Sequence, residues 1–157
     1  MQMTWVGAPT IYYGDEAGVP GFTDPDSRRP YPWGHEDETM LSFYRTLLEV
    51  RRSWDVFRDG SLIELYEDGP VIAYGRFKET SQAVVIVNAG DERRPLKIPV
   101  WLLGLSREEP VSFKRLFKTH EPGFNTDKFT IRCEDGLMEL KASPHEAMIF
   151  GRKTEER

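Results

Sequence analysis

Residues 62–77, LIELYEDGPVIAYGRF, contain two short apolar runs on either side of a turn sequence. The runs are Leu62–Tyr66 and Val71–Phe77, and the turn between them is Glu-Asp-Gly-Pro. More runs of this kind follow, separated by polar or glycine-containing breaks and with no helical period between them: 83–87, 96–100, 111–117, 129–133, 137–141 and 147–150. Short strands at this spacing predict a mainly β fold, an antiparallel β-sandwich of Greek-key type.

The segment Glu36–Ser53, which precedes these strands, has a different period. Its apolar residues recur every three or four positions, its acidic residues lie at the start, and Arg51 and Arg52 lie at the end. This pattern predicts an amphipathic helix whose charges complement the helix dipole. Asp37 and Glu38 are the candidate capping residues.

The segment before this helix, residues 7–33, reads GAPTIYYGDEAGVPGFTDPDSRRPYPW. Thr10–Tyr13 is β-branched and aromatic, and it is bounded by proline and glycine, which predicts a buried parallel strand. Gly14–Gly34 is rich in glycine and proline and is expected to be a loop throughout. Loops of this length are usually functional or disordered.

This segment resembles the α-amylase family of glycoside hydrolases (family 13), in particular its cyclomaltodextrinase, neopullulanase and maltogenic amylase branch. In that branch a G-x-P-x-I-Y-Y-G-D-E run precedes D-P-x-x-R and R-P-x-x-W. The matching positions here are Gly7, Pro9, Ile11–Glu16, Asp24, Pro25, Arg28, Arg29, Pro30 and Trp33. The resemblance implies three parts: residues 1–56 as a remnant of the last strand, loop and helix of a (β/α)8 barrel, 57–151 as the C-terminal β-sandwich domain, and 152–157 as a frayed tail.

The resemblance also implies that the catalytic groups lie elsewhere. The family's nucleophile Asp, acid/base Glu and third Asp are on earlier barrel strands, and no residue of this chain matches them. We therefore expect the C-terminal fragment of an α-glucan-acting hydrolase of the maltodextrin, cyclodextrin or pullulan class, inactive alone. Asp15 with Glu16, or Asp24 with Asp26, are poor replacements, because neighbours on a strand face opposite sides and no element holds the second pair rigid.

Asp24 and Arg28 are the candidate substrate-binding residues. A carboxylate accepts and a guanidinium donates hydrogen bonds, so the pair can hold adjacent sugar hydroxyls from two directions. In the family, residues of the D-P-x-x-R motif bind glucose on the non-reducing side of the scissile bond. The alternative is a salt bridge within the loop, worth at most about 1 kcal/mol if it is exposed.

Two other functions stay open. The chain could be a stand-alone starch- or maltodextrin-binding module, for which Trp101 is a candidate surface platform, although an aromatic residue in an apolar run is more often core. It could instead be a structural or oligomerisation subunit that self-associates, or binds a partner chain, through the unpaired backbone of Thr10–Tyr13. Within that run, Tyr12 and Tyr13 are expected to divide between core and a hydrogen-bonded barrel wall.

Composition restricts the remaining classes of function. With 157 residues the chain is too short for a whole barrel of roughly 250 residues, and its net charge of −5 argues against nucleic acid. No apolar stretch approaches the roughly 20 residues of a membrane span, and no secretion signal is expected. The single cysteine, Cys133, cannot form a disulfide within the chain, which favours a reducing cytoplasm or a fold that needs no disulfide. No cofactor is expected, and the spacing of the three histidines predicts no metal site.

Overall fold

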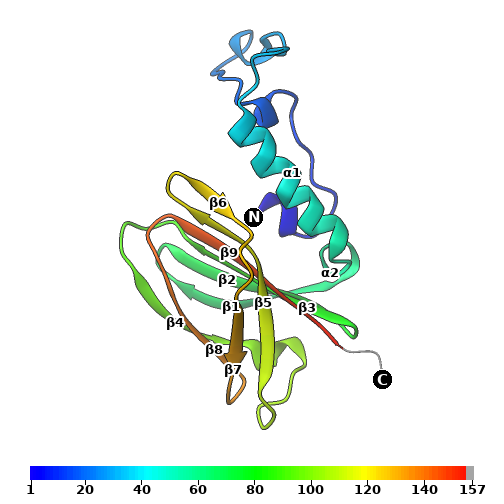
Figure 1. The fold of residues 1–157 in the computed structure, drawn as a ribbon, viewed down its shortest axis with the longest axis vertical. Coiled ribbons are helices and arrows are strands. Elements are labelled where there is room, and N and C mark those ends of the chain that lie inside the picture. The colour runs from blue at the N-terminus through cyan, green and yellow to red at the C-terminus, as the bar shows by residue number, and fades with distance from the viewer. Residues whose placement is uncertain (155–157) are drawn as a thin grey trace.

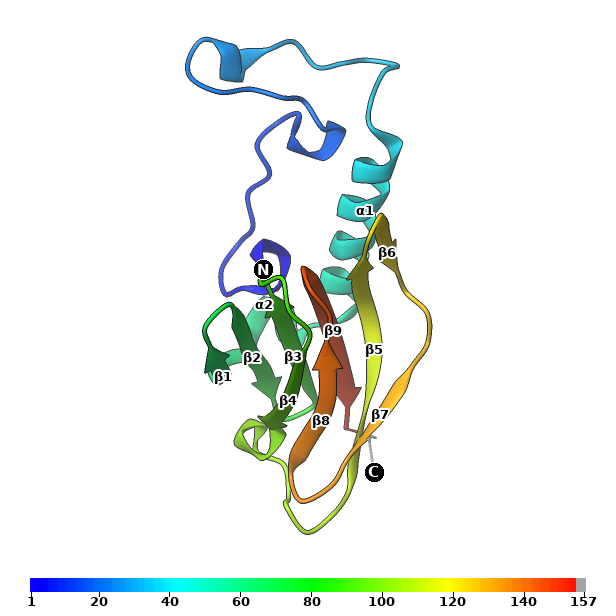
Figure 2. The same ribbon diagram turned by 90° about the vertical axis from the view of Figure 1, so that its left-hand side faces the viewer.

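The computed structural model describes residues 1–154 and is built mainly from antiparallel β-strands (Figures 1 and 2). The eight strands predicted after the helix are all present, with bounds that differ from the predicted runs by a few residues: β1 Ser61–Asp68, β2 Val71–Lys78, β3 Ser81–Asn88, β4 Arg94–Pro99, β5 Val111–His120, β7 Thr130–Cys133, β8 Leu137–Ala142 and β9 Glu146–Lys153. A further strand, β6 (Gly123–Asn125), was not predicted.

The strands form two sheets. The larger sheet has the order β1-β2-β3-β9-β5-β6, with β7 also paired to β5, and the smaller sheet pairs β4 with β8. Every pairing is antiparallel. The chain crosses between the sheets at β4 and β8, and the last strand, β9, lies between β3 and β5. The predicted antiparallel β-sandwich is therefore confirmed.

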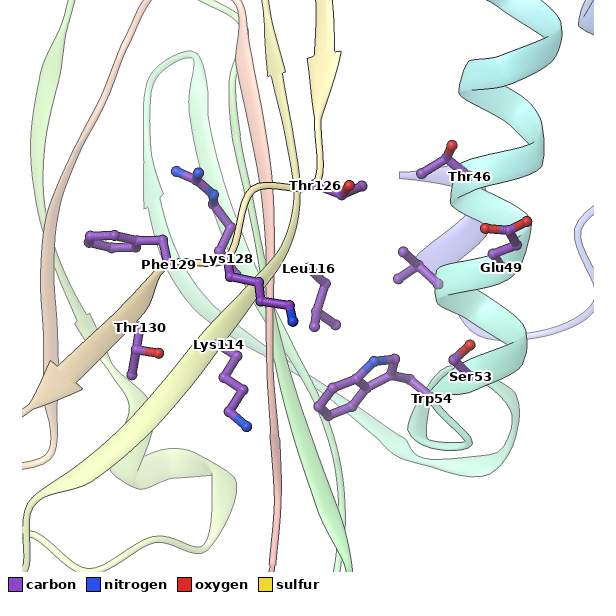
Figure 3. Close-up of a pocket in the computed structure, with 12 residues that line it drawn as sticks. Thr46, Glu49, Ser53, Trp54, Lys114, Leu116, Thr126, Lys128, Phe129 and Thr130 are labelled. Atoms are coloured by element: carbon purple, nitrogen blue, oxygen red, sulfur yellow. The ribbon is translucent and has the colours of Figure 1, made fainter.

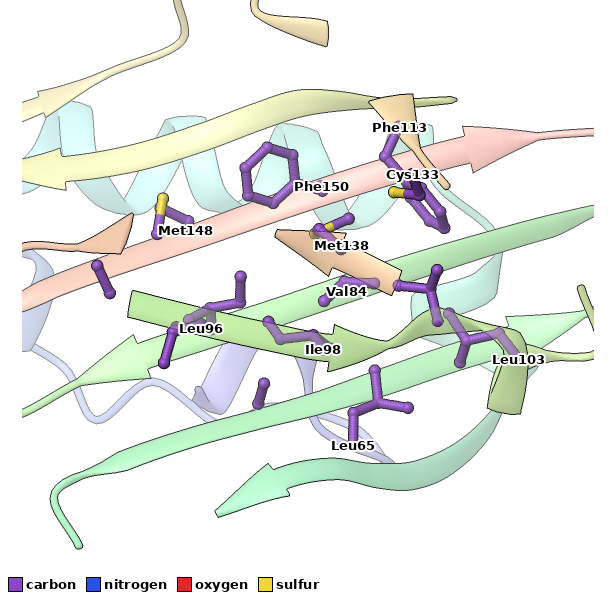
Figure 4. Close-up of a cluster of buried hydrophobic side chains, with 14 of the residues drawn as sticks. Leu65, Val84, Leu96, Ile98, Leu103, Phe113, Cys133, Met138, Met148 and Phe150 are labelled. Atoms are coloured by element: carbon purple, nitrogen blue, oxygen red, sulfur yellow. The ribbon is translucent and has the colours of Figure 1, made fainter. Parts of the chain in front are cut away.

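The main hydrophobic core lies between the two sheets (Figure 4). Alternate residues of the larger sheet, such as Val84 and Ile86 of β3, point into it and meet Leu96 and Ile98 of β4. Because side chains alternate along a strand, the other half of each strand in the larger sheet faces away from this core.

The opposite face of the larger sheet is covered by helices. α1 (Glu38–Ser53) and the short α2 (Val56–Asp59) contribute to a second apolar cluster there, in which Phe57 of α2 is fully buried and Phe43 and Leu47 of α1 are partly buried. The helix α1 was predicted, and its cap is Asp37, whose Oδ1 accepts the backbone N–H of Met40 at 3.0 Å. The large sheet thus lies between a helical layer and the small sheet.

The predicted strand Thr10–Tyr13 is wrong: these residues form no strand and pair with no sheet. Tyr12 and Tyr13 are 51% and 46% exposed, so the expected core position for one of them is also wrong. A parallel strand is held by neighbouring strands, and none flanks this segment in the described part of the chain. It runs beside α1 as an extended connection to the loop (Figure 1).

The segment Gly14–Gly34 is loop as predicted, apart from two single turns of 3-10 helix at Asp15–Ala17 and Asp26–Arg28. It lies at the end of α1 that is far from the sheets (Figure 2). Through residue 154, the chain contains no helix long and apolar enough to span a membrane. Half of the predicted tail, 155–157, is outside the described residues, whereas Arg152 and Lys153 belong to β9.

Candidate functional site

The loop before α1 brings the two predicted sugar-binding residues together. Arg28 Nε lies 2.7 Å from Asp24 Oδ1, and the two side chains are 70% and 64% exposed. The 3-10 turn Asp26–Arg28 places them on the same side of the loop, four residues apart. The pair is therefore already formed in the free chain, and both groups remain open to solvent.

A second ion pair fixes the shape of this loop. Asp26 Oδ1 accepts Arg29 Nε at 2.8 Å and Arg29 Nη2 at 2.6 Å, and Asp26 Oδ2 accepts the backbone N–H of Phe22 at 3.1 Å. The carbonyl of Arg29 in turn accepts the hydroxyl of Tyr13 at 3.0 Å. Asp26 is thus engaged in holding the loop, whereas within residues 1–154 the side chains of Asp24 and Arg28 pair only with each other.

Exposed aromatic side chains lie on the same loop as the pair, and no role was predicted for them from the sequence. Phe22 and Trp33 are 90% and 80% exposed, and the ring of Trp33 lies 4.5 Å from that of Tyr31 between centroids. A hollow of about 170 Å³ on this loop is lined by residues that include Tyr12, Asp15 and Phe22. Aromatic rings beside carboxylates and guanidinium groups are suited to sugars, which have apolar ring faces and hydroxyl edges.

Asp15 and Glu16 point to different sides of the segment. Asp15 lines the hollow beside Tyr12, whereas Glu16 lines a separate groove together with Tyr44 of α1. Glu16 Oε2 also accepts the backbone N–H of Gly14 at 3.0 Å, which gives it a structural role. The two carboxylates do not face a shared space, so this geometry gives them no joint catalytic use.

A larger groove of about 520 Å³ lies between α1 and the sheet (Figure 3). Leu116 of β5 and Trp54, the residue that follows α1, are directed into it, and Lys114 and Lys128 reach toward its edge. Trp101, the candidate platform in the sandwich, is half-buried, and the guanidinium carbon of Arg107 lies 3.7 Å from its ring centroid. One face of that ring is therefore already occupied.

Two further side chains that could be reactive are Cys133 and His145. Cys133 is buried in the main core, and burial raises the pKa of its thiol to about 11, so it is protonated at neutral pH. His145 Nε2 lies 2.8 Å from Asp91 Oδ1 at the surface. Within residues 1–154 no group of three or more His, Cys, Asp or Glu side chains is arranged to hold a metal ion.

Comparison with known proteins points to one family. No family model matches the sequence. The chain is 41% identical over 105 residues to an amylopullulanase from Thermoanaerobacter thermohydrosulfuricus, a match that covers 60% of this chain and 7% of that protein. It is 35% identical over 120 residues to neopullulanase 2 from Thermoactinomyces vulgaris, covering 69% of this chain and 20% of that protein.

A solved structure agrees with these relatives over nearly the whole chain. The debranching enzyme from Nostoc punctiforme superimposes with a TM-score of 0.71 and 25% identity over 96% of this chain, which corresponds to 29% of that enzyme. The chain therefore spans less than a third of the length of each of these three proteins. The matched fold is the one found in the C-terminal domains of such enzymes. This chain is similar to the C-terminal part of enzymes of the α-amylase family of glycoside hydrolases (family 13), of the cyclomaltodextrinase, neopullulanase and maltogenic amylase type.

Proposed function

We propose that this chain supplies sugar-binding and domain-packing parts, and no catalytic group, to an α-glucan-acting hydrolase. The observation that carries the proposal is the preformed, exposed pair of Asp24 and Arg28, on the loop that matches the family's D-P-x-x-R motif. The relatives are named for enzymes that act on α-glucans, which supports an α-glucan as the ligand.

The pair has the chemistry that recognition of a glucose unit needs. The carboxylate of Asp24 accepts hydrogen bonds from two hydroxyls, and the guanidinium of Arg28 donates several from a rigid plane. Phe22 and Trp33 add exposed ring faces on the same loop. A sugar on this loop alone is open to water on its other side, so we expect binding weaker than millimolar.

The N-terminal unit, residues 1–56, also has an apolar face that no other part of residues 1–154 covers. A groove of about 410 Å³ runs between the extended segment and α1, lined by Ile11, Tyr13, Glu16, Leu41, Tyr44, Arg45 and Leu48. None of the residues of α1 is fully buried. Large exposed apolar patches mark interaction sites. In this proposal the rest of the barrel covers the face and brings the catalytic carboxylates.

Hydrolysis assays on maltodextrin, β-cyclodextrin and pullulan test whether this chain binds sugar while the preceding barrel strands supply the catalytic groups. The pure chain should release no sugar, and mixing it with a separately produced chain that carries the preceding barrel strands should restore turnover. An Asp24→Ala, Arg28→Ala double variant should lose most of that restored turnover while binding the other chain equally well. Turnover by the pure chain, if abolished by Asp15→Ala or Asp24→Ala, would overturn the proposal.

A stand-alone binding module is the second candidate, and the exposure of Phe22 and Trp33 is the observation that favours it. Calorimetry with maltoheptaose separates the two functions. A dissociation constant below about 0.1 mM for the pure chain, lost in a Phe22→Ala, Trp33→Ala variant, supports the module. Binding too weak to measure supports the first function, in which the chain binds sugar only together with the rest of the hydrolase.

A further inference from the structure

Arg76 of β2 is a buried cation with an unusual set of partners. Its side chain is on the helical side of the large sheet and is only 1% exposed. Nη1 donates to the carbonyl oxygens of Thr4 at 2.8 Å and Phe57 at 3.3 Å, and Nη2 donates to that of Gly60 at 2.7 Å. Among residues 1–154 no carboxylate pairs with it. Its charge is stabilised by backbone carbonyl dipoles from two separate segments, the N-terminal residues and α2 with its C-cap Gly60.

Arg51 of α1 binds the same N-terminal segment from the other side. Its Nη1 donates to the carbonyls of Met3 at 2.9 Å and Trp5 at 3.3 Å, and its Nη2 donates to that of Gly7 at 2.6 Å. Two arginines, one from the helix and one from the sandwich, thus bind four of the five carbonyl groups between residues 3 and 7.

Two side-chain contacts attach this segment to the sandwich as well. The hydroxyl of Tyr74, next to Arg76 on the same face of β2, shares a hydrogen bond of 2.6 Å with Thr4 Oγ1. The ring of Trp5 meets that of Tyr74 edge-on, at 5.0 Å between centroids. Met3 and Thr4 are buried, although the segment belongs to no sheet.

We propose that Arg51 and Arg76 are positioning residues that clamp the backbone of residues 3–7 onto the sandwich, so that the C-terminal domain fixes where the sugar-binding loop begins. The segment continues without a break from Gly7 through Tyr13 to Asp24 and Arg28. The significance of the clamp for sugar binding rests on the proposed function, whereas the existence of the clamp does not depend on it.

The chemistry of the clamp explains why both residues are arginine. A guanidinium has five N–H donors in a fixed plane and keeps its charge when buried, whereas a lysine ammonium is a single compact donor group. Because the bonds go to carbonyl oxygens, the clamp holds the chain's path independently of the side chains at 3–7. Burial, followed by the nearby charge of Arg51, lowers the pKa of Arg76, so the two cations are close, and both donate to carbonyl oxygens of the same segment.

Hydrogen–deuterium exchange on the full chain tests the clamp. Arg51→Met and Arg76→Lys should each speed exchange of peptides covering residues 1–13 at least tenfold, while peptides from β3 and β9 exchange at the wild-type rate. Chymotrypsin should also cut faster after Trp5 and Tyr12. The matched control is Lys97→Met, which removes the exposed 2.9 Å pair with Glu139 on the far sheet and should change neither region.

Two results would overturn the clamp. One is wild-type exchange in residues 1–13 of a folded Arg51→Met chain; the other is a uniform rise over all peptides, which is the signature of a merely structural residue. If Arg76→Lys does not fold, Arg51→Met, at a half-buried position on α1, carries the test. No readout involves a sugar, so failure of maltoheptaose binding by the wild type bears on the proposed function and leaves the clamp unaffected.

Discussion

Replacing Gly75 by alanine should destabilise the sandwich, although alanine is favoured over glycine in a strand. A Cβ built on Gly75 of β2 points into the main core, closer to Leu103 Cδ2 than real carbon atoms approach, and 3.2 Å from Leu65 Cδ1. Overpacking a core by one carbon costs about 1–3 kcal/mol, whereas removing a strand glycine gains about 0.5–1 kcal/mol. The steric cost is the larger, so we expect a net loss of about 1–2 kcal/mol.

Urea denaturation and thermal melting of the full chain measure this change. A loss of about 1–2 kcal/mol corresponds to a melting temperature lower by about 2–8 °C for a domain of this size. The matched control is Gly123→Ala in β6, where an added Cβ meets nothing within 4 Å and stability should be unchanged or slightly raised. Adding Leu103→Ala to Gly75→Ala should give a double variant more stable than the sum of the two single losses predicts.

The refuting result is specific. If Gly75→Ala is as stable as the wild type, or more stable, strand propensity outweighs packing and the close approach of β2 to the 3-10 turn Val100–Leu103 is not a rigid feature of the core. Equal losses at Gly75 and Gly123 would show that the effect is not steric.

Further predictions concern the cap of α1, the exposed ion pair of the loop, stability at acid pH and the thiol of Cys133. Asp37→Ala removes the α1 cap and should lower the free energy of unfolding by about 1 kcal/mol in urea titrations, whereas Asp37→Asn should lower it less. Asp24→Ala should change the unfolding free energy by no more than about 0.5 kcal/mol, because its ion pair is exposed, and a larger change in urea titrations would give the pair a structural role. The hydrogen bond from Lys78 holds the pKa of Asp55 below its usual value of 3.8, so its contribution is present at neutral pH and is lost as pH falls below about 4; Asp55→Asn should flatten the acid side of a stability–pH profile. Cys133, buried and with a pKa raised to about 11, should react with iodoacetamide at pH 8 only as fast as the domain unfolds, and rapid native-state labelling would contradict its burial.

The alternating pattern predicted the strands well because each has one face in a core. The run 71–77, for example, forms β2 as one of the two strands expected around a Glu-Asp-Gly-Pro turn. The three residues of β6 and the four of α2 were not predicted, because segments this short show no period. The order of the strands, with β9 between β3 and β5, depends on long-range pairing that no local pattern encodes.

The structure of the N-terminal unit, residues 1–56, was harder to predict from the sequence. Thr10–Tyr13 has the composition of a buried strand, and its failure to form one reflects missing neighbours rather than propensity. The proximity of Asp24 and Arg28 was predicted from their spacing, whereas the role of Arg76 was not. An arginine at an alternating position of β2 predicts a solvent-facing side chain, and only the packing of α2 and residues 3–7 over that face buries it.

Because β9 lies in the middle of the large sheet, that sheet can be completed only after β9 has been synthesised. A growing chain that has emerged from the ribosome as far as His145 has both flanking strands but not the one that joins them, so half of the large sheet must wait for the final residues of the domain. Deletion of Glu146–Lys153 alone would therefore separate β3 from β5 and disrupt the larger sheet.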